Sequence, residues 1–211
     1  MKYLEFQKKY RHFPIIYSRD LVRPAKSLQV MRNQIRRWQA KWLIEKLRRG
    51  IYILSAGGPE QSRPDANWIA NRLYEPSYLS LETALAFYGL IPEKVTELVS
   101  ITPRKTMQFE NKIGHFVYRH VKPVVFRGFQ TAGEGEFAFF MAEPEKAVVD
   151  FLYFHLSDFK GNAKEILKES YRFQNIEGLK KKKLLGWCKL FQVRKLTRVV
   201  ATFCAMIDEE S

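Results

Sequence analysis

Side chains suited to reading DNA bases lie close together in residues 27–38. Arginine pairs with guanine through two hydrogen bonds, and asparagine or glutamine pairs with adenine in the same way. On a helix, at about 100° per residue, Gln29, Asn33 and Arg36 share one side, and two further arginines lie at its margins. The candidates for DNA contact on this helix are therefore Gln29, Arg32, Asn33, Arg36 and Arg37.

The other side of the same helix is apolar. Leu28, Met31, Ile35 and Trp38 follow a 3-4-3 spacing and fall within a sector of about 80°. We expect these four side chains to pack against a core, with Ser27 as the N-cap of the helix.

A second basic group follows in a predicted β-hairpin. Two apolar strands flank Arg48-Arg49-Gly50, where glycine supplies the positive φ that a tight turn demands. In a winged fold this turn lies beside the DNA backbone, so Lys46, Arg48 and Arg49 would contact phosphate groups. The alternative is that these charges only solvate an exposed helix and hairpin. The agreement of charge, helix face and turn favours DNA.

The segments before the helix of residues 28–38 also have predicted secondary structure. Residues 2–10 predict a first helix with Leu4 and Phe6 near its inner side, residues 13–16 a short extended run, and residues 19–22 a brief second helix. A third helix and a hairpin after these elements are typical of a winged helix-turn-helix.

Charge also divides the chain. Residues 1–55 hold 14 of the 36 Lys and Arg residues but only three acidic ones, so this part carries most of the net charge of +14 and is suited to a polyanion. The Gly- and Pro-containing stretch that follows reads as a linker. We expect an α+β protein with a winged helix-turn-helix DNA-binding domain in residues 1–55, a linker in residues 56–74 and a mixed α/β domain in residues 75–211.

The larger domain is expected to combine short antiparallel strands with helices. A helix is predicted over residues 81–88, where Gly89 ends it, and another begins at Pro144. From Ala163 onward the chain is expected to be mostly helical. The predicted strands cover residues 95–102, 105–109, 114–121, 125–131 and 137–142.

Four segments resemble one known family. They are residues 47–52, Ser77 to Pro92, Ser100 to Lys105 and Ala142 to Leu152, and in this order they resemble the AbiEi family of abortive-infection antitoxins over nearly the whole chain. The resemblance implies a winged helix that binds double-stranded promoter DNA and represses its own operon. It also implies that the C-terminal domain counteracts a nucleotidyltransferase-like AbiEii toxin without forming a stable complex with it. The two proteins would then form a type IV toxin-antitoxin system in phage defence.

The tail departs from that family, because Lys180 to Lys183 is more basic than expected. This run forms a second basic patch with Arg194, Lys195 and Arg198, and a solvated face and a nucleic-acid contact remain equal alternatives for the patch. The competing functional hypothesis is a solitary nucleic-acid-binding protein, directed to DNA or RNA, in which the tail lysines do the main work. A third hypothesis is that the protein is an enzyme with an unrecognised fold.

Residues that could support catalysis are few. The chain has no phosphate loop and no Gly-x-Ser-x-Gly or His-Glu-x-x-His motif. His115 and His120 are five apart on a predicted strand and point to opposite faces, whereas His12 and His155 lie beside aromatic residues and are expected to pack. We therefore expect no enzyme, no cofactor and no metal site.

Three carboxylates in one segment have structural explanations. Glu143 and Glu145 suit the positive end of the dipole of the helix that begins at Pro144. Asp150 is followed by apolar residues and is expected to be partly buried with a partner such as arginine or a backbone N–H. A role for Asp150 in the antitoxin surface is the alternative.

The chain also suggests where the protein acts. No apolar run approaches the ~20 residues that a helix needs to cross a bilayer, and the first nine residues are too charged for a signal peptide. Cys188 and Cys204 have no nearby histidine and are expected to be reduced core thiols. We expect a cytoplasmic protein with no membrane partner.

Overall fold

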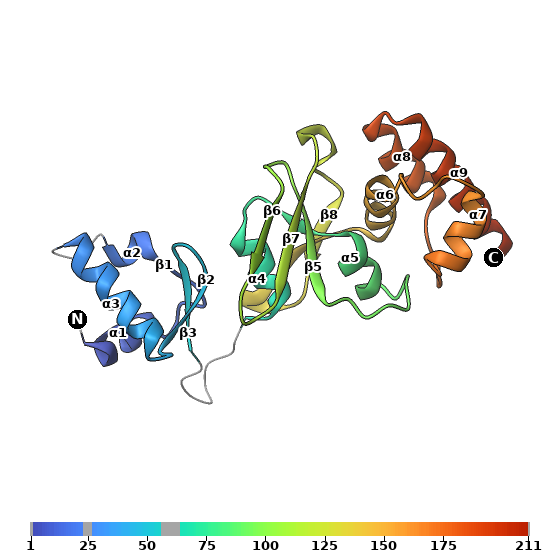
Figure 1. Ribbon diagram of the computed structural model, residues 1–211. Helices are drawn as coiled ribbons and strands as arrows, with labels where there is room; N and C mark the ends of the chain where they lie inside the picture. The colour runs from blue at the N-terminus through green and yellow to red at the C-terminus, as the bar shows by residue number, and fades with distance from the viewer. Residues whose placement is uncertain (1, 23–26, 56–63, 211) are drawn as a thin grey trace.

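A computed structural model describes residues 2–22, 27–55 and 64–210 (Figure 1). The protein is a mixed α+β structure with one three-stranded and one six-stranded sheet, as the sequence predicts for the fold class. Figure 1 shows the small sheet with α1, α2 and α3 at one end of the molecule and helices α6 to α9 at the other, with the large sheet between them.

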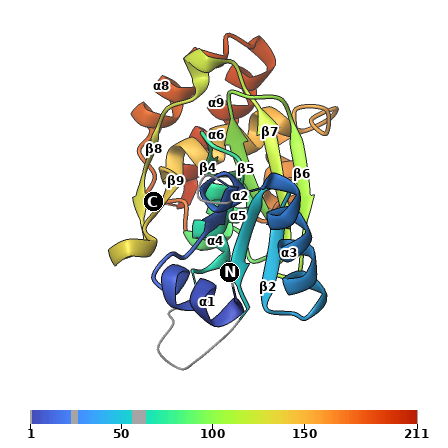
Figure 2. The ribbon, with the colours of Figure 1, turned by 90° about the vertical axis from the view of Figure 1, so that its left-hand side faces the viewer.

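In its described residues, the N-terminal part contains three helices and the small sheet. Strand β3 lies in the middle of this sheet and pairs antiparallel with both β1 and β2. Figure 2, which faces this part, shows α3 beside β2. The elements are α1 (Tyr3–Tyr10), β1 (Ile16–Tyr17), α2 (Ser18–Val22), α3 (Leu28–Ala40), β2 (Ile44–Arg48) and β3 (Ile51–Leu54).

Aromatic rings fix α3 against α1. The ring centroids of Phe6 and Trp38 are 4.4 Å apart, and Tyr3 meets Trp38 edge to face at 5.9 Å. Phe6 is buried as expected, but Leu4 is 69% exposed, so its predicted inward position was wrong. Residues two apart on a helix diverge by about 200°, and α1 turns Phe6 and Tyr10 inward instead.

The larger part surrounds the six-stranded sheet, whose order is β6-β7-β5-β4-β9-β8. Its α-helices and strands are α4 (Ala66–Leu73), β4 (Tyr78–Leu79), α5 (Leu81–Phe87), β5 (Glu97–Thr102), β6 (Met107–Glu110), β7 (His115–His120), β8 (Phe129–Ala132), β9 (Phe139–Ala142), α6 (Pro144–Phe154), α7 (Ala163–Glu165), α8 (Lys181–Phe191) and α9 (Arg194–Glu210). Short 3₁₀ turns cover Pro123–Val125 and Gly135–Phe137, and a π turn covers Ile166–Ser170.

The sheet is mixed, and the prediction of antiparallel strands was wrong for two pairs. Strands β5 and β7 pair parallel, as do β4 and β9. Strand β6 pairs on the outer side of β7 and not between β5 and β7, so two strands that run in the same direction become direct neighbours. The antiparallel pairs are β6 with β7, β4 with β5 and β8 with β9.

Part of the predicted linker is a structured element. Residues 66–73 form α4, and Asp65 caps this helix by accepting a hydrogen bond from the Trp68 backbone N–H at 2.7 Å. Ile69 and Leu73 are fully buried in the larger core. The sequence did not predict this helix, because Gly and Pro residues precede it. Residues 56–63 of the predicted linker lie outside the described residues.

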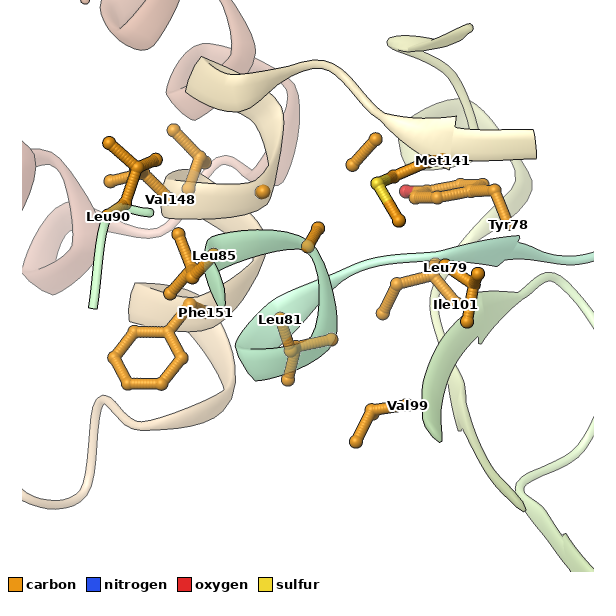
Figure 3. Close-up of a cluster of buried hydrophobic side chains, with 14 of the residues drawn as sticks. Tyr78, Leu79, Leu81, Leu85, Leu90, Val99, Ile101, Met141, Val148 and Phe151 are labelled. Atoms are coloured by element: carbon orange, nitrogen blue, oxygen red, sulfur yellow. The ribbon is translucent and has the colours of Figure 1, made fainter. Parts of the chain in front are cut away.

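The core of the larger part lies between the sheet and the helices. Figure 3 shows Leu81 and Leu85 of α5 beside Val148 and Phe151 of α6, next to Tyr78 and Met141 from the sheet. Helix α8 packs on α6 and on α9. Cys188 and Cys204 are free and buried among these helices, where burial raises the pKa of both thiols, as expected for core thiols.

Candidate nucleic-acid interface

Helix α3 presents a polar, basic surface. The five predicted contact residues on it are all exposed: Gln29, Arg32, Asn33, Arg36 and Arg37. The amide of Gln29 donates a hydrogen bond to the Asn33 side-chain oxygen at 3.3 Å, which confirms that these two side chains share one face. None of the three arginines forms an ion pair with another described residue.

The opposite face of α3 is buried. Met31, Ile35 and Trp38 are only 8%, 4% and 3% exposed, which confirms the predicted core positions. Ser27 holds the N-cap position, but its hydroxyl makes no capping hydrogen bond. The burial of the Leu28 side chain lies outside what the structure describes.

The hairpin turn differs from a free wing. Gly50 has a φ of +84°, as the tight turn requires, and both Lys46 and Arg49 are exposed. Arg48 is half-buried, because its Nε donates a hydrogen bond to the Leu73 carbonyl and its guanidinium lies 5.6 Å from the centre of the Phe109 ring. Arg48 therefore links the hairpin to the larger part, a contact that sequence patterns do not indicate.

Other contacts hold the hairpin in the same place. Asn111 donates a hydrogen bond to the Leu47 carbonyl at 3.1 Å, and the Lys112 ammonium lies 3.2 Å from the centre of the Trp42 ring. Leu47 and Ile53 are buried in the same cluster as the core of the larger part. Figure 1 shows the hairpin between α3 and the larger part, so α3 keeps the outer position.

The histidines that might have served catalysis have separate structural partners. His115 Nδ1 lies 2.7 Å from a Glu97 carboxylate oxygen, and His120 Nδ1 donates to the Arg104 carbonyl at 2.8 Å. His155 stacks on Phe151 with ring centroids 4.2 Å apart. Within the described part of the chain, no group of three or more His, Cys, Asp and Glu side chains has a geometry that would hold a metal ion.

Asp150 is fully buried in a polar cluster. It accepts hydrogen bonds from Ser80 at 2.9 Å and Tyr78 at 3.1 Å, and it forms an ion pair with Lys146, one helical turn earlier. Burial lowers the pKa of Lys146 and raises that of Tyr78 well above its usual value. The expected partner was an arginine or a backbone N–H, and the partners found are lysine, tyrosine and serine side chains.

A cavity of about 520 Å³ lies in the larger part beside β5, β7 and α6. Among the described residues its wall contains three carboxylates, each beside a nitrogen partner: Glu93 forms an ion pair with Arg172, Glu82 lies 3.3 Å from His155 Nε2, and Glu97 lies 2.7 Å from His115 Nδ1. These pairs explain the carboxylates of this wall as structural groups.

The basic tail is partly neutralised by the protein itself. Lys183 pairs with Glu143 at 2.7 Å, and Lys181 pairs with Asp208. Glu145 is 5% exposed and accepts a hydrogen bond from the Lys180 backbone N–H at 3.1 Å. These contacts explain Lys181 and Lys183 as structural residues. They also show that Glu143 and Glu145 bind residues of the tail, in addition to lying at the positive end of the α6 dipole.

Comparisons with known proteins do not identify a family. No protein-family model matches the chain, and no curated protein matches it. None of the helices in the described residues is long and apolar enough to cross a membrane.

Proposed function

We propose that the protein is a DNA-binding transcriptional repressor whose residues 1–55 act as a winged helix-turn-helix. The order of α1, β1, α2, α3, β2 and β3, with β1 paired to β3, supports this assignment. The ligand is double-stranded promoter DNA, and α3 is the helix that enters the major groove.

One observation carries the proposal. Helix α3 has an apolar side on which Met31, Ile35 and Trp38 are buried. Its exposed side carries Gln29, Asn33 and Arg36, which are the residue types that form paired hydrogen bonds with adenine and guanine. The exposed Lys46, Arg37 and Arg49 would contact backbone phosphates, which position the protein without reading sequence.

We also propose that the protein is the antitoxin of a toxin-antitoxin operon, with this activity in residues 75–211. The support is the resemblance to the AbiEi family, in which the antitoxin counteracts a nucleotidyltransferase-like toxin without a stable complex. The alternative is a solitary nucleic-acid-binding protein, which would lack a toxin gene next to its own.

The test of DNA recognition uses Arg36→Ala. Affinity is measured for the duplex directly upstream of the protein's own gene and for a scrambled duplex, at one salt concentration. Loss of a bidentate contact to guanine should weaken binding to the upstream duplex by about 1–3 kcal/mol, with a much smaller effect on the scrambled one.

The matched control is Arg198→Ala, which removes an exposed arginine from α9. It should change neither affinity by more than about twofold. An equal loss on both duplexes for Arg36→Ala would assign Arg36 to the backbone, and no loss on either would show that α3 does not contact DNA.

A further inference from the structure

A cavity of about 260 Å³ lies where the hairpin turn meets the larger part of the protein. Its wall comes from both parts of the chain: from α2 and the hairpin on one side, and from the end of α4 and the loop after β5 on the other. The charged residues in this wall are Arg19, Arg48, Arg49, Arg72, Glu75 and Arg104.

Aromatic rings hold most of these arginines in place. The guanidinium of Arg104 lies 4.4 Å from the centre of the Tyr74 ring, and that of Arg19 lies 4.7 Å from the Tyr17 ring. Arg72 lies 5.3 Å from the Trp68 ring. Stacking of this kind restricts a long side chain, so less conformational entropy is lost when the guanidinium binds a ligand.

Hydrogen bonds to the protein backbone add to this order. Arg104 donates to the Glu75 carbonyl at 2.9 Å, and Arg48 donates to the Leu73 carbonyl. Both bonds leave other N–H groups of each guanidinium free, because arginine has five donors. The cavity is thus lined by positioned donors.

Positive charges outnumber negative ones among the described residues of the wall. These described residues include five arginines and one carboxylate, Glu75, which already pairs with Arg72 at 3.0 Å. Like charges around a small concave surface raise its positive potential and favour an anion there. Arginine is the side chain best suited to phosphate, because its planar donors match two phosphate oxygens at once.

We propose that this cavity binds a backbone phosphate of the duplex that α3 contacts, so that both parts of the protein hold the DNA. This rests on the proposed function. The volume favours a phosphate of a polymer over a whole nucleotide, since pockets that enclose complete small ligands are about 300–1,000 Å³. The hairpin turn, with exposed Arg49, is the element expected beside the DNA backbone, and residues of that turn line the cavity.

The test uses the full chain with Arg104→Gln, because Arg104 lies outside the proposed winged helix. Affinity for the upstream and the scrambled duplex should fall equally, by about tenfold, as expected for loss of a charged hydrogen bond to phosphate. The slope of log affinity against log salt should become shallower by about 1. The matched control is Lys105→Gln, which removes an exposed charge next in sequence and should leave affinity within about twofold.

A second variant separates binding from folding. Arg19→Gln removes another charge from the cavity, and its only ion pair in the described part of the chain is an exposed one with Asp20 at 3.8 Å. It should keep the thermal midpoint of the wild type while lowering affinity for both duplexes. Wild-type affinity in both Arg19→Gln and Arg104→Gln would overturn the proposal.

The outcomes also separate this proposal from DNA recognition by α3. If Arg36→Ala loses discrimination while Arg104→Gln binds normally, α3 reads DNA and the cavity does not contact it. If Arg104→Gln weakens both duplexes while Arg36→Ala has no effect, the cavity binds phosphate and the role of α3 fails. A different outcome would be that inorganic phosphate stabilises the wild type but not Arg104→Gln, while the variant binds DNA normally. The cavity would then bind a free phosphorylated ligand and not a phosphate of DNA, which would overturn the proposal.

Discussion

Arg48 and Arg49 are neighbours in one turn but have different surroundings. Arg49 is exposed, whereas Arg48 is half-buried between the Leu73 carbonyl and the Phe109 ring. The sequence assigns both residues to the DNA backbone, because a run of basic residues at a turn has no feature that distinguishes them. Only the docking of the hairpin on α4 and β6 separates their roles.

This difference predicts distinct effects of two alanine substitutions. Arg48→Ala leaves the partly buried Leu73 carbonyl without its donor and should destabilise the protein by about 1 kcal/mol or more. Arg49→Ala should leave stability within about 0.5 kcal/mol and weaken binding to all duplexes alike. Urea unfolding and DNA titration measure the two effects. Equal stability of the two variants would contradict the structural role of Arg48.

The buried pair of Lys146 and Asp150 is expected to be structural. Asp150→Leu should cost about 3–5 kcal/mol of folding free energy, because it leaves a buried ammonium without its carboxylate. The double variant Lys146→Met/Asp150→Leu should lose less than the sum of the two single variants, since both charges are gone. Additive losses in urea unfolding would show that the two side chains do not stabilise each other.

The position of Asp150 shows how far sequence reasoning extends for a single residue. The apolar residues after it predict burial and the need for a partner, and both are confirmed. Lys146 lies four positions earlier on the same helix, so the helical spacing was already a signal for this ion pair. Tyr78 and Ser80 come from a distant segment, β4 and the start of α5, which only the tertiary fold brings to α6, so no local pattern reveals them.

Gly128 couples the segment before β8 to α8. It has a φ of +78°, and a Cβ placed on it would lie 2.9 Å from the Trp187 ring. We predict that Gly128→Ala destabilises the protein by about 2 kcal/mol or more, through overpacking and a strained backbone. Urea unfolding measures this loss.

The control for Gly128→Ala lies next to the same tryptophan. Gly186 is in the interior of α8, is exposed, and has open space where a Cβ would be. Gly186→Ala should stabilise the protein by roughly 0.5–1 kcal/mol, because alanine favours a helix over glycine. Equal effects of the two substitutions would contradict the close packing of Trp187 on Gly128.

Elements with a strong local period were predictable, and elements defined by distant pairing were not. The 3-4-3 spacing of α3 and the Pro144 start of α6 each gave the observed helix. Helix α4 was missed because its segment follows Gly and Pro residues, and Tyr78–Leu79 is too short to show a strand period. The parallel pairing of β5 with β7 depends on the edge position of β6, which alternation along a strand does not encode.

The two parts of the chain share a core, and this decides how the antitoxin hypothesis can be tested. Ile15, Leu47, Ile51 and Ile53 belong to the same buried cluster as the core of the larger part. Removing residues 1–55 would expose the surface that they cover, and an unfolded fragment would say nothing about activity. A variant of the full chain is the better probe.

We predict that antitoxin activity survives loss of DNA reading in the full chain. Asn33→Ala/Arg36→Ala removes two exposed side chains from α3 and leaves its buried face and the shared core unchanged, so the larger part should keep its fold. Cells that express the neighbouring toxin gene together with this variant should grow as well as cells with the wild type, while a reporter driven by the upstream promoter loses repression. Both proteins are expressed from an unrelated promoter, so that lost repression does not alter their amounts. Loss of rescue at wild-type protein levels would place the antitoxin activity on α3 or in DNA binding itself, and retained repression would contradict the role of α3.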